Sequence, residues 1–156
     1  MKKLIFAVAT VFVSVSLGAA PVSAASSGSS YVESQIRYAL SAIPGGERTA
    51  YDTVEWERGD VVLTVSNSPA SKAVGTCATG AFCAFSGFSL AGSRLSFTTC
   101  TTHSTAQLSA VHSIANAKAA NDVQARNSSS TVLVTLDPAS QVNTAPAGVS
   151  QLRCVP

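Results

Sequence analysis

Few side chains in this chain of 156 residues could carry out catalysis. It holds two histidines, His103 and His112, and only 12% of its residues are charged. His103 lies among threonines and serines in residues 101–105, a polar stretch typical of a loop, and the sequence identifies no partner that would make it a general base. No G-x-S-x-G motif, phosphate-binding loop or dinucleotide fingerprint is present. We therefore predict that the protein is not an enzyme and needs no cofactor.

The other reactive side chains are four cysteines, at Cys77, Cys83, Cys100 and Cys154. Their separations of five, 16 and 53 intervening residues lack the paired short spacing of zinc sites, so we expect two disulfides and no metal. A turn through Gly80 can bring the first two Cα atoms within about 6 Å, which favours Cys77–Cys83 with Cys100–Cys154. The rival pairing, Cys77–Cys100 with Cys83–Cys154, stays open, because sequence does not determine connectivity.

An oxidising destination is indicated by the first residues of the chain. Lys2 and Lys3 precede an apolar run over residues 4–17, and the small-residue pattern Val22-Ser23-Ala24 follows. This is the signature of a secretory signal peptide over residues 1–24, cleaved after Ala24. The run of 14 apolar residues is too short to span a bilayer comfortably. We expect a secreted, extracellular protein that is not embedded in a membrane.

The formal charge argues against generic electrostatic partners. The whole chain carries 10 basic and 8 acidic residues, and removal of Lys2 and Lys3 leaves the two signs equal in number. Strong non-specific binding to nucleic acid or to an anionic membrane needs a basic surface. We therefore expect no nucleic-acid partner and no membrane partner.

The elements that must position these side chains divide into a leader and a main domain. In residues 25–66 the offsets of Val32, Ile36 and Leu40 trace one face of a helix over residues 31–43. Two strands, over residues 49–56 and 61–65, then form a β-hairpin around a Gly-containing turn. One helix and one hairpin are too little to fold well alone, so we expect them to pack on the rest with Trp56 buried.

A linker over residues 67–75 leads to the main domain, residues 76–156. Short apolar runs separated by turn residues predict strands at residues 82–86, 94–99, 112–115, 123–126, 131–136 and 149–154. Many short strands with frequent turns are typical of a small all-β sandwich. The predicted fold class is thus all-β, with a small N-terminal helix plus hairpin as an appendage.

Residues 82–97 resemble a βγ-crystallin Greek-key motif. That motif has an aromatic residue, four variable residues, a second aromatic residue, one variable residue and a glycine. Phe85, Leu90 and Gly92 occupy these positions here, and Leu90 departs from the usual aromatic residue. The pattern produces a folded-over hairpin, in which the glycine takes a backbone conformation that a Cβ would strain.

The wider pattern resembles a family of secreted bacterial peptidase inhibitors. The Cys77-x₅-Cys83 spacing, this hairpin and residues 114–120 look like the family typified by the streptomycete metalloproteinase inhibitor, which has a βγ-crystallin-like fold. The resemblance covers about residues 76–137, and the residues after Asp137 fit a second Greek key poorly and look truncated.

This resemblance implies a secreted inhibitor of peptidases, metallopeptidases included, that acts by non-covalent binding to an extracellular peptidase. The alternative is a non-enzymatic extracellular binding or interaction module of the βγ-crystallin type. The candidate partner-binding loop is Gly87, Phe88, Ser89 and Leu90, within the bend of residues 87–93. Residues 101–105 form a second candidate contact segment.

A prediction about calcium follows from residues 116–121. Crystallin motifs often bind calcium through a run of Asn/Asp, Asn/Asp, two variable residues, Ser/Thr and Ser, but Ala117 and Ala120 lack the side-chain oxygens that calcium needs. We expect Asn116 to be a turn residue and no metal to bind. A micromolar site at millimolar calcium would stabilise the fold by about 4 kcal/mol. Thermal melting with calcium and with chelator should therefore coincide, and a shift of several degrees would contradict the prediction.

Overall fold

The computed structural model describes residues 27–67 and 77–156 of the chain. The predicted signal peptide and residues 68–75 of the predicted linker lie outside these ranges. The described elements are α1 (Ser27–Ala42), β1 (Glu47–Ala50), β2 (Thr53–Trp56), η1 (Glu57–Gly59), β3 (Val61–Thr64), β4 (Phe82–Phe85), β5 (Arg94–Phe97), β6 (Thr102–Ser104), β7 (Ser113–Asn116), β8 (Asp122–Arg126), β9 (Val132–Leu136), β10 (Ser140–Val142) and β11 (Gln151–Val155). Within the described ranges, no helix has the length and apolar character that crossing a membrane requires.

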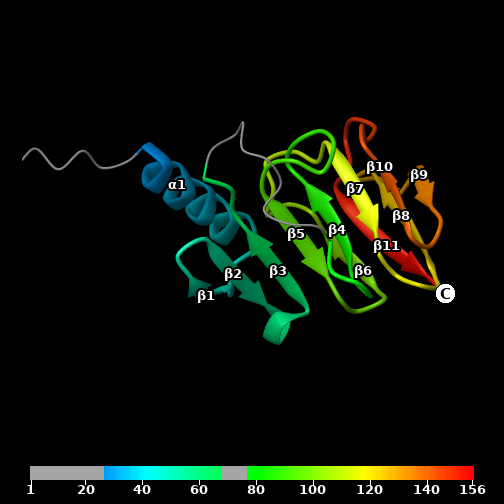
Figure 1. Cartoon of the computed structure of the whole chain (residues 1–156), viewed down its shortest axis with the longest axis horizontal. Helices are drawn as coiled ribbons and strands as arrows, with labels where there is room; N and C mark the ends of the chain where they lie inside the picture. The colour runs from blue at the N-terminus through cyan, green and yellow to red at the C-terminus, as the bar shows by residue number, and fades with distance from the viewer. Residues whose placement is uncertain (1–26, 68–76) are drawn as a thin grey trace, which may run out of the picture.

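The strands form two antiparallel sheets that lie next to each other in Figure 1. Sheet A has seven strands in the order β1-β2-β3-β5-β4-β7-β10, and sheet B has four in the order β6-β11-β8-β9. Side chains from both sheets share one core cluster, to which sheet A gives Phe82 and Ile114 and sheet B gives Val123 and Leu152. The prediction of an all-β fold is confirmed for the described part of the chain.

Two strands, β6 and β10, each pair in the sheet opposite to that of the strand before them in the chain, which connects the two sheets. β6 follows β5 in the chain but pairs with β11 in sheet B, and β10 follows β9 but pairs with β7 in sheet A. The residues after Asp137 supply β10 and β11. β11 lies between β6 and β8. The three-residue strand β10 was not predicted, because it is short and lies between the turn residues around Pro138 and Pro146.

The predicted leader is part of sheet A. β3 pairs with β5 in the main domain, with Leu63 opposite Leu95, and β2 and β1 extend the sheet beyond β3. The hairpin prediction is confirmed in β2 and β3, but a turn at residues 51–52 interrupts the strand predicted over residues 49–56. β1 was not predicted as a separate strand, because all four of its residues are exposed and show no apolar alternation. The pairing with β3 covers an edge of β5 that would otherwise offer free backbone groups to other chains.

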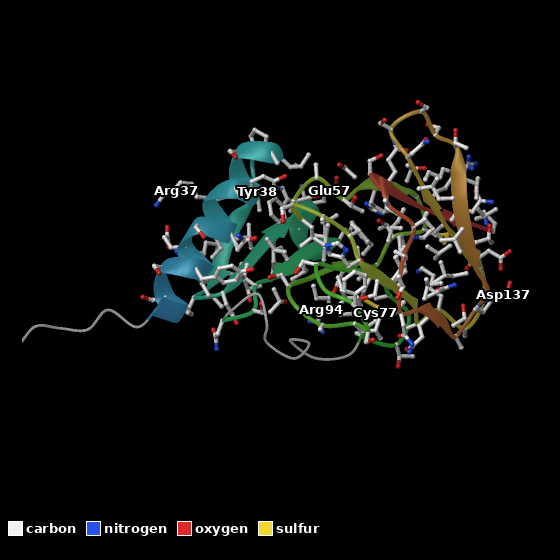
Figure 2. The ribbon with its side chains drawn as sticks, turned by 90° about the horizontal axis from the view of Figure 1, so that it is seen from above. Arg37, Tyr38, Glu57, Cys77, Arg94 and Asp137 are labelled. Atoms are coloured by element: carbon white, nitrogen blue, oxygen red, sulfur yellow. A yellow bond between two sulfur atoms is a disulfide. The ribbon has the colours of Figure 1, made fainter. Side chains whose placement is uncertain are left out.

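α1 packs its apolar stripe on the core, as the sequence predicted. Val32 and Ile36 are buried in the same cluster as Trp56, and Leu40 is partly buried against it. The Trp56 indole Nε1 donates a hydrogen bond to the carbonyl of Ile43 at 2.9 Å, which joins β2 to the end of the helix. Figure 2 shows Tyr38 on the side of α1 nearer the sheets and Arg37 on the opposite side.

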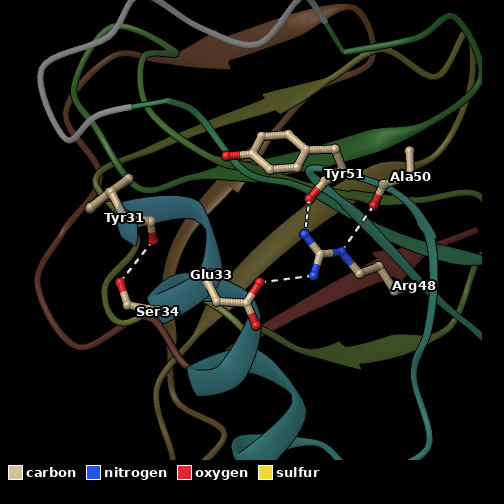
Figure 3. Close-up of polar contacts among 6 residues, drawn as sticks. All are labelled: Tyr31, Glu33, Ser34, Arg48, Ala50 and Tyr51. Carbon is tan, nitrogen blue, oxygen red and sulfur yellow. Dashed lines mark hydrogen bonds and ion pairs between the residues drawn. The ribbon is translucent and has the colours of Figure 1, made fainter. Parts of the chain in front are cut away.

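Arg48 adds a polar connection between α1 and the first hairpin (Figure 3). Its Nη1 donates to Glu33 Oε2 at 2.9 Å, its Nε donates to the carbonyl of Ala50 at 3.2 Å, and its Nη2 donates to the carbonyl of Tyr51. Both members of the ion pair are exposed, and exposed pairs contribute about 0–1 kcal/mol. The apolar stripe therefore holds the helix more strongly than this pair does.

The two disulfides are Cys77–Cys83 and Cys100–Cys154, which confirms the favoured pairing and excludes the rival one. The first closes a short loop that leads into β4, with Cα atoms 5.8 Å apart. The second joins the segment after β5 to β11, with Cα atoms 4.9 Å apart. Cys154 thus anchors the last strand of the chain to the segment between β5 and β6.

Deletion of residues 25–66 should lower the melting temperature markedly or prevent folding. The deletion removes Val32, Ile36 and Trp56 from the core and uncovers the edge of β5. Each buried aliphatic side chain contributes about 1.5–3 kcal/mol. Circular dichroism melting of the truncated and full chains tests this, and equal melting temperatures would mean that the leader is independent.

Replacing each disulfide by a pair of alanines should destabilise the protein unequally. The sequence separations are 6 and 54 residues, for which loop-closure entropy predicts losses of about 2 and about 4 kcal/mol respectively. Urea denaturation of Cys77→Ala/Cys83→Ala and Cys100→Ala/Cys154→Ala measures both losses. A larger loss from the first pair would show that local packing outweighs chain entropy here.

Candidate functional site

The candidate loop is a bend that folds back over the end of the β4–β5 hairpin. The backbone N–H of Ser86 donates to the carbonyl of Ser93 at 2.9 Å, and that of Gly87 donates to the carbonyl of Ala91 at 3.0 Å. Ser89, Leu90 and Gly92 have φ angles of 53°, 60° and 75°. A Cβ on Gly92 would clash with the hydroxyl of Ser86, so glycine is required at that position for space as well as for φ.

Ser113, at the start of β7, holds this bend closed from a neighbouring strand. Its side chain is fully buried, and its hydroxyl accepts a hydrogen bond from the N–H of Leu90 at 2.8 Å. The same hydroxyl donates to the carbonyl of Gly87 at 2.6 Å. The N–H of Ser89 also donates to the carbonyl of Asn143 at 2.9 Å. Contacts from two distant segments thus preorganise the loop, which lowers the entropy that binding would cost.

The four predicted loop residues divide into a partly buried pair, Gly87 and Leu90, and an exposed pair, Phe88 and Ser89. Leu90 is partly buried against Cys83 and Phe85, and Gly87 bonds to Ser113, so both serve to close the bend. Phe88 is 54% exposed, and Ser89 is also exposed. The Phe88 ring packs against the His112 ring, with centroids 4.7 Å apart. Phe88 and Ser89 are therefore the loop residues that a partner can reach.

The interpretation of residues 101–105 as a loop is wrong, because Thr102–Ser104 forms strand β6. His103 is buried, and its ring stacks on Phe97 with centroids 4.8 Å apart. Its Nε2 lies 3.0 Å from the carbonyl of Thr99, which can only accept, so this nitrogen donates. Alternation with period two buries the imidazole and exposes Thr102 and Ser104. The histidine is thus a core residue, and the two exposed hydroxyl residues remain available to a ligand.

Asn116 is also not the turn residue that we expected. It is the last residue of β7, is buried, and lies with Nδ2 at 3.0 Å from the carbonyl of Asn121 and 3.1 Å from that of Asp137. Its Oδ1 accepts from the N–H of Lys118 at 3.2 Å. The side chain therefore ties β7 to two neighbouring segments. Across the described ranges, no group of three or more His, Cys, Asp or Glu side chains is placed to hold a metal ion.

Two hollows share lining residues, and Phe88 of the candidate loop borders one of them. One has a volume of about 440 Å³ and is bordered by Phe88, His112 and Ala145, among others. The second has a volume of about 610 Å³ and extends to Tyr38 on α1 and to β6. Both hollows are lined by residues 109, 110 and 149, so they adjoin each other. A further hollow of about 450 Å³ lies beside Cys77 and Lys118.

Among the described residues that line the first two hollows, none is Asp, Glu, Lys or Arg. Arg94 follows the bend in sequence, and desolvation by partial burial lowers the pKa of its guanidinium. A guanidinium nevertheless keeps its charge in proteins, so it cannot transfer a proton as an acid or base. The loop is therefore suited to contact through an aromatic ring and neutral polar groups.

Ser113 could not be found from the sequence, because its contacts with Leu90 and Gly87 span 23 and 26 residues. We predict that Ser113→Ala destabilises the fold by about 1–3 kcal/mol, since the N–H of Leu90 loses its buried acceptor. Urea denaturation measures the loss. Ser109→Ala, at an exposed serine, is the matched control and should change stability by less than about 0.5 kcal/mol. Equal effects of the two changes would contradict the role of Ser113.

Comparison with known proteins gives no relative from which a function could be inferred. No family model matches the chain, and neither a curated protein nor a solved structure matches it.

Proposed function

We propose that this protein is a secreted, non-covalent inhibitor of an extracellular peptidase, and that metallopeptidases are the class to test first. The observation that carries the proposal is the exposed Phe88 ring on a bend closed by Ser113. Aromatic side chains that are held rigidly lose little freedom on docking and often dominate the binding energy of an interface. Phe88 is then the central contact, with Ser89 beside it.

The fold of the inhibitor is, in this proposal, a βγ-crystallin-like pair of Greek keys. The strand order supports it, because β7 returns to pair with β4 and β11 returns to pair with β8. Each group of four strands also gives its third strand, β6 or β10, to the other sheet. Two disulfides are compatible with the oxidising exterior where such an inhibitor would act.

The backbone of the loop indicates how inhibition would occur. A segment that imitates a peptide substrate must be extended, whereas Ser89 and Leu90 are in the left-handed region with φ of 53° and 60°. The loop therefore cannot lie in a catalytic cleft as a substrate-like strand without opening the bond between Leu90 and Ser113. We propose that it blocks access by covering the entrance, so it is not cleaved.

The second candidate function is a binding module that does not inhibit an enzyme. The hollow of about 440 Å³ next to Phe88 favours it, because a concave surface can receive a projecting side chain of a partner. An inhibitor that covers an entrance would instead use mainly the convex ring of Phe88. The two functions differ in whether binding alters turnover by the partner.

The decisive experiment is titration of the purified protein against a panel of metallo-, serine and cysteine peptidases. We expect sub-micromolar inhibition of at least one, weakened about 10- to 100-fold by Phe88→Ala. Tyr51→Ala is the matched control, because Tyr51 is 55% exposed and Phe88 54%, and it lies in the turn between β1 and β2. It should inhibit like the wild type.

Two results would overturn parts of this proposal. Absence of inhibition across all three classes would reject the inhibitor and leave the binding module. Inhibition that is equally strong in Phe88→Ala and wild type would reject the loop as the contact surface. Recovery of the intact, uncleaved inhibitor after prolonged incubation with the inhibited peptidase is expected from the left-handed backbone, and cleavage between residues 87 and 91 would contradict it.

A further inference from the structure

The hollow of about 610 Å³ lies away from Phe88 and has its own chemistry. Its floor includes Thr102 and Ser104 of β6 and Gln151 of β11, which is paired with Ser104. The neighbours His103 and Leu152 are buried, so these three side chains project from the outer face of sheet B. Tyr38 of α1 borders the same hollow and is 42% exposed.

The lining combines apolar side chains, among them Leu108 and Val149, with neutral polar groups, and none of the described residues that form it is charged. It presents hydroxyl groups from Tyr38, Thr102, Ser104, Ser109 and Ser128, and the amide of Gln151. The Ser104 hydroxyl accepts the N–H of Ala106 at 3.2 Å. In the part of the chain that the structure describes, the hydroxyls of Thr102, Ser109 and Ser128 are not used by another protein group. Each of these hydroxyls can both donate and accept a hydrogen bond.

This lining selects among classes of ligand. An ionic ligand would lose hydration without a charged partner, and an apolar ligand would leave the hydroxyls without hydrogen bonds. An extended peptide would pair with the free edge of β6, but Thr102, Ser104 and Gln151 place the hollow over the face of the sheet. What remains is a neutral ligand with its own hydroxyl edges and with apolar C–H faces that can lie on an aromatic ring.

We propose that this hollow binds a neutral oligosaccharide or polysaccharide, with one sugar ring stacked on Tyr38. The volume of about 610 Å³ lies within the range of roughly 300–1,000 Å³ that is typical of small-ligand sites. The hollow shares residues 109, 110 and 149 with the neighbouring hollow that Phe88 and His112 border, so a longer glycan could reach from one hollow to the other. Glycan binding would hold the protein on a neutral polysaccharide surface independently of any peptidase.

The test is isothermal titration of the purified, disulfide-bonded protein with cellohexaose, N-acetylchitohexaose and maltohexaose, and with oligogalacturonate as an anionic probe. We expect binding to at least one neutral probe and none to oligogalacturonate. Tyr38→Ala should weaken binding about tenfold, because it removes the stacking surface while alanine preserves the helix. Tyr51→Ala removes another exposed tyrosine that does not border the hollow and should bind like the wild type.

Further measurements keep the proposal separate from peptidase inhibition. Tyr38→Phe should retain most of the affinity, and a Thr102→Val/Ser104→Ala variant should lose affinity while melting like the wild type. Binding of no neutral hexasaccharide at millimolar concentration would overturn the proposal. So would equal affinity of Tyr38→Ala and wild type, or saturable binding of oligogalacturonate alone. Tyr38→Ala should inhibit any target peptidase normally, so failure of one proposal does not imply failure of the other.

Discussion

Burial of β4 on both faces is the constraint on which the rest of the structure depends. Phe82 and Ala84 point into the core shared with sheet B, and Cys83 and Phe85 point to the opposite face. A strand covered on one side only would leave Phe85 in water. The folded-over bend solves this by placing Leu90 on Phe85, with the Cys77–Cys83 disulfide at the same face. Because the bend must close over Phe85, Phe88 is left exposed at its tip.

The N-terminal segment contributes both to sheet A and to the hollow that we propose as a glycan site. β3 covers the edge of β5, and α1 covers the core through Val32 and Ile36. Tyr38 of the same helix lines the hydroxyl-lined hollow together with Thr102 and Ser104 of β6. The N-terminal segment and the main domain therefore each form part of its wall. The fold and this hollow therefore depend on one docking interaction, made largely by apolar side chains.

The two surfaces differ in the way their geometry is maintained. The Phe88 bend is held by hydrogen bonds with the Ser113 hydroxyl and with the carbonyl of Asn143, so its shape is set before any partner would bind. The hydroxyl-lined hollow sits on strands β6 and β11, and the Cys100–Cys154 disulfide joins the segment just before β6 to β11. The described residues that form both surfaces are uncharged, which suits specific short-range contacts better than long-range steering.

Local patterns in the sequence determined the apolar helix face of Val32 and Ile36 and the strands around Phe82, Leu95 and Val134. They also determined the glycine of the bend at position 92. These features follow from side-chain periodicity and turn chemistry, which act over a few residues. Loop length also favoured the correct disulfides. Tertiary structure alone decided that β3 pairs with β5, that His103 is buried in a strand, that Ser113 closes the bend and that Tyr38 faces β6. These contacts join residues far apart in the chain, and such a contact forms only when sheet register and packing bring its two sides together.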